Sequence, residues 1–319
     1  MIVFACDVGG TNARLSLVEL SGRPRVVARE VVHVAEHSGL LPPLSAFLAR
    51  HDASPSRGCV ALAGTVQDPR RVQGLNLPWA VDAEELERDC GFERVRLIND
   101  FEAAARGIDA LGPEDLLQVQ GRPDPAGRRA VLGAGTGLGQ AFLLPGRDGA
   151  QVVSTEGGHR DFAPTSPEQD RLLAHLRAIH GRVSTERVLS GPGLAAIYAW
   201  LLTEGEPACD GVDPARDRPA AIAASAHPTC RRAVSLFVDV YGAEAGNVAL
   251  TVLATGGVFL AGGIAPKLFA GSPALQAQLR ERFAAKGRFR ELLAGLPLAV
   301  VVQPNLGLLG AALCATELD

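Results

Sequence analysis

The sequence predicts an α/β protein with two domains, and three observations support this fold class. The chain has 319 residues, more than one hydrophobic core ordinarily organises. Segments with strand character alternate with helix-favouring segments. A strand that enters a glycine cluster and leaves as a second strand occurs twice, at residues 3–18 and 131–144, which indicates a repeated supersecondary unit. We therefore expect two related domains.

The composition is that of an ordinary globular enzyme. Hydrophobic residues make up 47% of the chain and charged residues 21%, and the net charge of -4 gives no sign of a nucleic-acid or anionic-membrane partner. No apolar run reaches membrane-spanning length, and residues 2–6 lead directly into Asp7, so we expect no membrane span, no signal peptide and a cytoplasmic location. The six cysteines form no Cys-x-x-Cys pair, which argues against a structural zinc site and a disulfide framework.

The first domain is expected to end near Asp109, after an alternation of strands and helices. Asp82 and Glu85 have the spacing of a capping box at the start of a helix, and Trp79 before them is expected to pack in the core. The expected strands are 2–6, 15–18, 26–34, 58–63 and 95–98, and the expected helices are 40–50, 81–89 and 101–111.

Asn99 and Asp100 lie where the strand 95–98 passes into the Ala-rich helix 101–111. A carboxylate in the first turn of a helix is kept ionised by the helix dipole, and at the carboxyl end of a strand it is well placed to act as a general base. The alternative is purely structural, because Asn is a common N-cap and Asp is common in the turn that follows. These two residues alone do not decide between the two interpretations.

The first glycine cluster, Gly9 and Gly10 followed by Thr11, lets the backbone come close to a ligand. The N–H groups of this turn and the threonine hydroxyl can cradle a phosphate, with Asp7 facing a bound Mg²⁺. A plain Gly-Gly hairpin is the alternative. The second cluster, Gly133 to Gly139, repeats the pattern and matches neither the Rossmann nor the P-loop spacing.

Polar residues among glycines continue through the second half of the chain. Glu156 and His159 lie on a Gly-rich loop with no apolar surface to cover, which favours a functional role. Glu186, in a short helix that Ser184 is expected to cap, is either a ligand or a charge that complements the helix dipole. The expected helices are 168–180, 194–202, 231–253 and 306–315, the strands are 258–264 and 297–302, and residues 205–218 are expected to form an exposed loop.

These motifs, in this order, resemble those of the bacterial glucokinases, which belong to the superfamily of sugar kinases, heat-shock ATPases and actin. The resemblance covers nearly the whole chain. Residues 7–14 and 133–139 look like the two phosphate loops of the family, 99–101 and 156–159 like its sugar motifs, and 260–264 like its adenosine segment. The fold that it implies is two ribonuclease-H-like (actin-like ATPase) domains around a central cleft, with boundaries 1–109 plus 300–319 and 110–299.

The resemblance also implies an activity and the residues that perform it. Glucose is phosphorylated at its 6-hydroxyl by ATP and Mg²⁺, with Asp100 as the general base; the enzyme is a homodimer, and no zinc is expected because no cysteine cluster follows His159. The implied glucose ligands are Asn99, Asp100, Glu156, His159 and Glu186; the implied ATP-binding residues are Asp7, Gly9, Gly10, Thr11, Asn12, Gly135, Thr136, Gly137, Gly262 and Gly263, with Asp7 reaching Mg²⁺ through water.

Two alternatives to a glucose kinase stay open. The same fold hosts many sugars, so the chain could act on another hexose or an amino sugar. It could also be a non-catalytic sugar sensor that kept the fold, although the retained Asp7, Asp100 and both glycine clusters speak against a loss of turnover.

Overall fold

The computed structural model describes residues 1–73, 77–147, 149–212 and 219–317. Contacts divide the chain into two compact units. Unit 1 comprises Met1–Pro113, Val152–Ser154 and Gln303–Asp319, and unit 2 comprises Glu114–Gln151 and Thr155–Val302. No helix among the described residues is long and apolar enough to cross a membrane.

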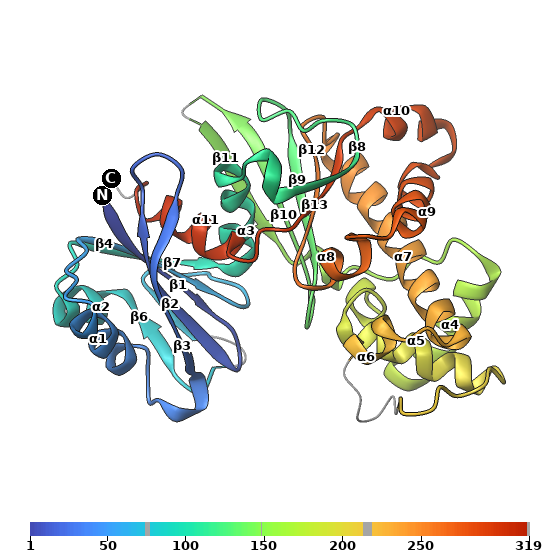
Figure 1. Cartoon of the computed structure of the whole chain (residues 1–319), viewed down its shortest axis with the longest axis horizontal. Coiled ribbons are helices and arrows are strands. Elements are labelled where there is room, and N and C mark those ends of the chain that lie inside the picture. The colour runs from blue at the N-terminus through green and yellow to red at the C-terminus, as the bar shows by residue number, and fades with distance from the viewer. Residues whose placement is uncertain (74–76, 148, 213–218, 318–319) are drawn as a thin grey trace. The chain divides into compact units, whose positions relative to one another are not determined.

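Unit 1 is built on a five-stranded sheet in the order β3-β2-β1-β4-β7 (Figure 1). The antiparallel β1 and β2 form the first glycine hairpin, while β4 and β7 run parallel to β1. The strands are β1 Ile2–Val8, β2 Asn12–Glu19, β3 Arg25–His33, β4 Arg57–Leu62 and β7 Arg94–Asn99, with a separate hairpin of β5 Arg71–Gln73 and β6 Ala80–Asp82. The helices are α1 Leu41–Arg50, α2 Ala83–Cys90, α3 Asp100–Gly107 and α11 Leu306–Cys314.

The alternation of side chains along β1 explains why helices cover both faces of this sheet. Phe4, Cys6 and Val8 belong to one buried cluster, which also contains residues of α1 and α2. Val3 and Ala5 belong to another cluster, formed with residues of α3 and α11. Both faces of the strand are therefore buried, and the whole of β1 is apolar up to Asp7.

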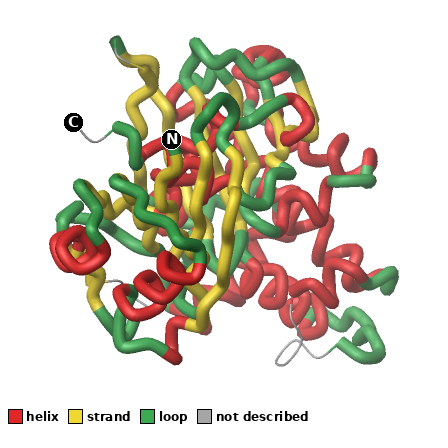
Figure 2. The backbone as a smooth tube through the Cα atoms, turned by 60° about the vertical axis from the view of Figure 1, so that its left-hand side comes forward, coloured by secondary structure: helices red, strands yellow, loops and turns green. Residues whose placement is uncertain are grey.

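Unit 2 contains a six-stranded sheet in the order β11-β10-β9-β12-β13-β8. Figure 2 shows strands in yellow and helices in red. The strands are β8 Leu116–Gln120, β9 Arg129–Ala134, β10 Leu138–Gly146, β11 Gly149–Thr155, β12 Gly257–Ala261 and β13 Leu298–Val301. The helices are α4 Pro167–His180, α5 Gly191–Thr203, α6 Pro219–Ala224, α7 Pro228–Val252, α8 Ile264–Phe269, α9 Pro273–Ala284 and α10 Arg290–Gly295. One large core contains residues of β9, β12, β13 and α7.

The repeated supersecondary unit is confirmed. In each unit an antiparallel glycine hairpin (β1–β2, β9–β10) is followed in the sheet by two parallel strands on the side of its first strand (β4 and β7, β12 and β13). The two sheets therefore share one strand order, 3-2-1-4-5, and β8 adds an edge strand to the second. The expected fold class, two ribonuclease-H-like α/β units, agrees with this topology.

Several elements differ from the expectations. Val300 pairs with Leu260 and Val301 pairs with Leu116, so β13 belongs to the sheet of unit 2 and unit 1 resumes at Gln303 rather than at residue 300. The strand expected at 258–264 ends at Ala261 because Gly262 turns the chain at φ +82. Strands β5, β6, β8 and β11 and helices α6, α8, α9 and α10 were not anticipated. The expected loop 205–218 lies outside the described residues from 213 onward.

Candidate functional site

The strand-to-helix junction of unit 1 places Asn99 and Asp100 in different roles. Asn99 is the N-cap of α3: its Oδ1 accepts from the backbone N–H groups of Phe101 at 2.8 Å and Glu102 at 3.1 Å, and its Nδ2 donates to Gly64 O at 2.9 Å. Asp100 is the first residue of α3 and is half-buried. Capping is therefore what Asn99 does in this structure, and this capping fixes the helix start from which Asp100 projects.

A second carboxylate, Glu102, lies in the first turn of α3 together with Asp100. Arg96 Nη2 donates to Glu102 Oε1 at 2.9 Å. Burial raises the pKa of the Glu102 carboxyl, and the nearby Arg96 guanidinium partly opposes that rise in pKa. The N-terminal end of α3 carries the positive end of the helix dipole, which stabilises a carboxylate in its first turn.

The first glycine hairpin carries its own charged pair. The register of β1 and β2 places Asp7 opposite Arg14, and Arg14 Nη1 donates to Asp7 Oδ2 at 2.8 Å. Asn12 lies on the same face of β2 as Arg14, two residues away. Its Oδ1 is buried, and no described residue donates a hydrogen bond to it.

Asp7 and Asn12 fit a hydrated Mg²⁺. The half-exposed Asp7 carboxylate and the unsatisfied Asn12 Oδ1 both accept hydrogen bonds, which is what the water shell of Mg²⁺ offers. At the turn, Gly9 N donates to Asn12 O at 2.9 Å, and Gly10 and Thr11 are exposed. A Cβ on Gly9 would come no closer than 3.7 Å to its neighbours, so the packing of this turn does not require a glycine there.

A residue outside the second glycine hairpin supports its turn. Gly135 N donates to Gly137 O at 2.8 Å within the turn, and a Cβ on Gly135 would meet nothing within 4 Å. Leu138 N, directly after the turn, donates to Glu186 Oε2 at 2.8 Å. A Cβ on Gly137 would lie 2.5 Å from the same Glu186 oxygen. Glu186 therefore supports the turn, while Thr136 at its tip is exposed.

Three of the expected sugar ligands meet in unit 2. His159 Nδ1 lies 3.9 Å from Glu186 Oε1, and His159 Nε2 lies 3.9 Å from Glu156 Oε2. The side chains of Glu156 and His159 are more than half exposed, at 55% and 57%, and that of Glu186 is 30% exposed. The imidazole thus lies between two carboxylates, an arrangement that offers acceptors and a donor to the hydroxyl groups of a sugar.

Glu186 lies on a single 3-10 turn, Thr185–Arg187, rather than on a helix capped by Ser184. The Ser184 side chain makes no capping hydrogen bond. The expectation of a Ser184 cap is therefore wrong, and the helix-dipole explanation of Glu186 loses its basis. Its observed contacts are with the second glycine hairpin and with His159.

The sequence did not reveal the residues that hold the loop of Glu156 and His159. A Cβ on Gly158 would overlap the Leu138 carbonyl oxygen, so this loop packs directly on β10. Arg160 Nε donates to Gly157 O at 3.1 Å, and the Arg160 guanidinium also pairs with the buried Glu244 of α7. Gln140 of β10 donates to Glu244 at 2.7 Å. Glu244 is 84 residues from Arg160, and no local sequence pattern connects them.

The glycine pair after β12 packs closely against the end of β9 at its first residue. Gly262 adopts φ +82, and a Cβ there would lie 2.6 Å from Ala134 O at the end of β9. Gly263 is exposed, precedes α8 and has open space at its Cβ position. The pair thus lies beside the second glycine hairpin, at the same edge of the sheet.

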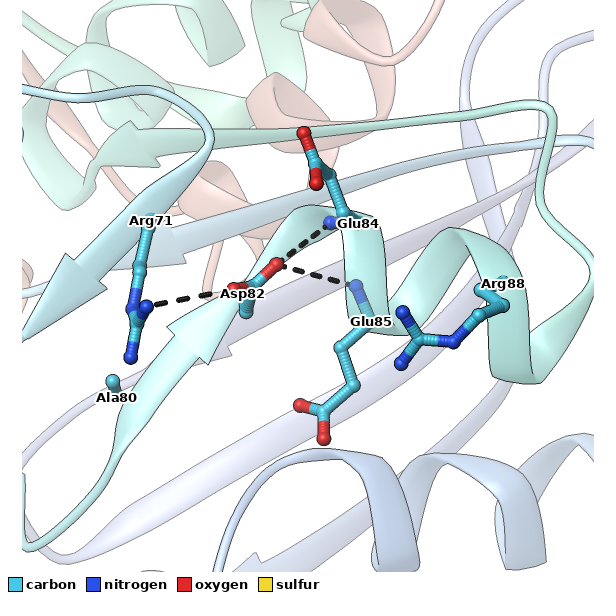
Figure 3. A pocket seen from close by; sticks show the side chains of 6 residues that line it. All are labelled: Arg71, Ala80, Asp82, Glu84, Glu85 and Arg88. Atoms are coloured by element: carbon cyan, nitrogen blue, oxygen red, sulfur yellow. Dashed lines mark hydrogen bonds and ion pairs between the residues drawn. The ribbon is translucent and has the colours of Figure 1, made fainter.

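One hollow of about 300 Å³ lies elsewhere in unit 1. Figure 3 shows its charged lining at the β5–β6 hairpin and the start of α2. Asp82 there accepts from Glu84 N at 2.9 Å and Glu85 N at 3.2 Å, and it lies 4.0 Å from Arg71. The capping of α2 explains these polar groups, and none of the expected site residues lines this hollow.

Comparisons with known proteins agree with these features. A family model described as Glucokinase matches residues 4–318. The chain is 38% identical to a glucokinase of Nostoc punctiforme, with 99% of each chain covered, and 39% identical to one of Klebsiella pneumoniae, with 96% of this chain and 94% of that one covered. A crystal structure of a glucokinase from an Antarctic psychrotroph superposes with a TM-score of 0.86 at 31% identity over 99% of each chain. The chain belongs to the glucokinase family.

Proposed function

We propose that this protein transfers the γ-phosphoryl group of ATP to the 6-hydroxyl of glucose, with Asp100 as the general base. The observation that carries the proposal is the junction of β7 and α3. Asn99 caps the helix with its own side chain, so Asp100 is held in the first helical turn at the carboxyl end of a parallel strand. Membership of the glucokinase family supports the same assignment.

In the proposed reaction the Asp100 carboxylate accepts the proton of the 6-hydroxyl as that oxygen attacks the γ-phosphorus. The new bond joins the 6-oxygen to phosphorus, the bond from phosphorus to the β-γ bridging oxygen breaks, and ADP leaves. Phosphoryl transfer passes through a loose transition state, so positioning and charge neutralisation contribute more than a strong base. A carboxylate that stays ionised near neutral pH is sufficient for this proton transfer.

The remaining sugar ligands are proposed to be Asn99, Glu156, His159 and Glu186. Carboxylates suit this task because each accepts hydrogen bonds from two neighbouring hydroxyl groups. A sugar that lacks one of these hydroxyls leaves a carboxylate unsatisfied, which costs about 1 to 3 kcal/mol. The ring nitrogens of His159 already lie 3.9 Å from both Glu156 and Glu186, which supports a shared role for these three.

The phosphates of ATP are proposed to contact the two glycine hairpins. The implied residues on the first are Gly9, Gly10, Thr11 and Asn12, and on the second Gly135, Thr136 and Gly137, with Gly262 and Gly263 facing the adenosine. Open space at the Cβ positions of Gly135 and Gly263 supports this assignment. Mg²⁺ supplies charge neutralisation on the phosphates when it is bound, and Asp7 and Asn12 are the groups that would hold its water shell.

Release of ADP from Mg-ATP by the purified protein tests this proposal. The assay runs without sugar and then with glucose, mannose, fructose, N-acetylglucosamine and N-acetylmannosamine at matched concentrations. Turnover that glucose alone stimulates strongly is the expected result. Stimulation by a different sugar would keep the mechanism and change the substrate, and no stimulation by any sugar, with sugar binding retained, would favour the sensor alternative.

The cytoplasmic location and the homodimer remain part of the proposal, and both derive from the resemblance. Light scattering on the eluate of a size-exclusion column measures the mass of the particle directly. A mass of two chains is expected, and a mass of one chain would contradict the homodimer.

A further inference from the structure

Three metal-ligating side chains come together in unit 2, and none of them is one of the proposed sugar or ATP residues. Sγ of Cys209, a ring nitrogen of His227 and Sγ of Cys230 lie within 4.8 Å of one another. Cys230 is fully buried, and the other two are half-buried. The cluster contains no carboxylate among the described residues. The sequence alone gave no indication of it, because Cys209 is 21 residues from Cys230.

The backbone holds the two halves of this cluster in place independently of the cluster itself. His227 is the N-cap of α7, and Cys230 lies in the first turn of that helix. The segment that carries Cys209 is fixed to α5, because Cys209 N donates to the Tyr198 hydroxyl at 2.9 Å. The same segment is fixed to α7, where Thr229 Oγ1 donates to Pro207 O at 2.7 Å.

A second contact to α7 confirms that this segment is anchored. Arg232, two residues after Cys230, pairs with Glu206 at 2.6 Å and with Glu168 of α4 at 2.6 Å. The Cys209 thiol is therefore brought to the start of α7 by backbone and side-chain contacts on both sides. The convergence of two sulfurs and an imidazole is a property of the fold rather than of one flexible side chain.

We propose that Cys209, His227 and Cys230 bind one Zn²⁺ ion. Two thiolates and one imidazole are a donor set that zinc prefers, whereas Mg²⁺ and Ca²⁺ prefer oxygen. In a tetrahedral zinc site, ligand sulfurs at about 2.3 Å from the metal are about 3.8 Å apart. Ligand atoms that already lie within 4.8 Å of one another reach that spacing by small rotations of the side chains. The fourth position is left to water.

Metal binding changes the contacts of two of the ligands. The Cys209 thiol donates to Asp210 O at 3.7 Å and lies 3.3 Å from Ser225 Oγ; as a zinc-bound thiolate it loses the first contact and accepts from the serine hydroxyl in the second. In this structure Thr229 N donates to His227 Nδ1 at 3.3 Å, so Nδ1 acts as the acceptor that caps α7. A zinc ion takes either that lone pair or the lone pair of Nε2 after the proton moves to Nδ1, and the cap bond is lost in both cases. A weak cap bond is a small loss compared with the free energy of binding zinc through two thiolates.

The ion would connect the segment of Cys209 to the start of α7 and would thereby stabilise unit 2. This inference does not depend on the reaction proposed above, since none of the three residues belongs to the sugar or ATP residues. The competing use of the same two sulfurs is a Cys209–Cys230 disulfide, which would exclude the metal. The experiment has to separate these two states.

Titration of the reduced, metal-free full-length protein with Co²⁺ tests the proposal. Binding of one equivalent is expected, with the thiolate-to-cobalt absorption and the intense visible bands of a tetrahedral site, and Zn²⁺ should displace the cobalt. Loss of a group that merely supports a ligand already lowers metal affinity about 10- to 100-fold, so we expect Cys209→Ser, Cys230→Ser and His227→Asn to lower it at least as much.

The variants are chosen so that a failure to fold cannot imitate a loss of ligands. Asn is itself a good N-cap, so His227→Asn keeps the start of α7 while it removes the imidazole. Cys90→Ser, in unit 1, is the matched control and should bind cobalt as the unmodified protein does. Absence of saturable binding, an unchanged spectrum in all three ligand variants, or a Cys209–Cys230 disulfide whose reduction restores no metal uptake would each overturn the proposal.

Discussion

The two glycine hairpins occupy the same place in the strand order of their sheets and are stabilised in different ways. In the first, the charged contact comes from the hairpin itself, because Asp7 pairs with Arg14 across the strands, and Val34 N donates to Thr11 O at the turn. In the second, Glu186 reaches the turn from 48 residues further along the chain and binds Leu138 N. The two units therefore share the order and direction of the strands, while the turns and the polar groups around them differ.

This difference separates contacts that the sequence can predict from contacts that it cannot. The partners of the first hairpin follow from strand register, so the sequence is sufficient to place them on one face. The partner of the second depends on where a distant loop packs. It also links the second hairpin to the sugar residues, because Glu186 contacts both the turn and His159.

The largest expected effect is on turnover, and it concerns the junction of β7 and α3 in unit 1. Asp100→Asn keeps the size of the side chain and its acceptor for Phe101 N but removes the base, so turnover should fall about 10³-fold or more while glucose affinity stays within about tenfold. Steady-state kinetics and a glucose titration measure the two quantities. Asp109→Asn, a few residues further along, is the control. Near-normal turnover in Asp100→Asn would exclude Asp100 as the base.

The second prediction compares two glycines of unit 2. Gly158→Ala should lower the free energy of unfolding by about 3 kcal/mol, because its Cβ would overlap the Leu138 carbonyl. Gly135→Ala meets nothing and should change stability by less than about 0.5 kcal/mol, while it raises the KM for ATP if phosphate approaches this turn. Urea unfolding and kinetics test both. Equal stability of the two variants would contradict the tight packing of Gly158.

The third prediction asks whether the acidic side chains at the two hairpins, Asp7 at the first and Glu186 at the second, serve different substrates. Glu186→Gln can still accept from Leu138 N but loses its charge beside His159, so the KM for glucose should rise roughly tenfold and the KM for ATP should change little. Asp7→Asn should do the reverse and raise the KM for Mg-ATP roughly tenfold. Glu168→Gln on α4 is the control. If each variant changed both constants equally, these two carboxylates would not differ in function.

The smallest expected effect is a pH dependence confined to unit 1. A hydrogen bond from Arg70 at 2.6 Å lowers the pKa of the Glu87 carboxyl from its ordinary value, and Val95 N adds a second bond at 2.7 Å. A carboxyl with a lowered folded-state pKa contributes stability above its unfolded-state pKa and loses it as the pH falls through the folded-state pKa. Glu87→Gln should therefore be less stable by about 1 kcal/mol at pH 7, and the difference should disappear in acid.

The two tryptophans allow this destabilisation to be assigned to one of the two units. Trp79 is buried in unit 1 and Trp200 in unit 2. With Trp200→Phe the fluorescence reports on unit 1, and with Trp79→Phe on unit 2. A destabilisation by Glu87→Gln that appears equally in both fluorescence signals would show that the two units unfold together. A destabilisation that stays the same at all pH values would contradict the role given to the charged Arg70–Glu87 pair.

The sequence was most informative where structure depends on neighbours along the chain. The alternation of Phe4, Cys6 and Val8 with Val3 and Ala5, the two glycine turns and the start of α3 could all be predicted, because each follows from local periodicity or capping. The three-residue strands β5 and β6 are too short to produce a periodic pattern.

The parts of the site that could not be predicted depend on contacts across long stretches of chain. Arg160 on the loop and Glu244 in the middle of α7 become partners only after both elements pack against β10. The cluster of Cys209, His227 and Cys230 could not be predicted for the same reason. Metal-ligand spacings such as Cys-x-x-Cys describe ligands on one segment, and Cys209 lies on a different segment from the other two.

Helix α11 has a consequence for the order in which the chain is made. It packs on α3 so closely that a Cβ on Gly310 would overlap Ala103 O, and it completes the cluster that buries Val3 and Ala5. During synthesis unit 1 lacks this layer until residues 306–314 emerge, about 200 residues after the rest of its sheet, a delay of roughly 10 to 40 s at ordinary translation rates. For that interval α3 covers this face of the first sheet without its partner helix, so the apolar side chains that α11 buries in the finished protein stay exposed on the nascent chain.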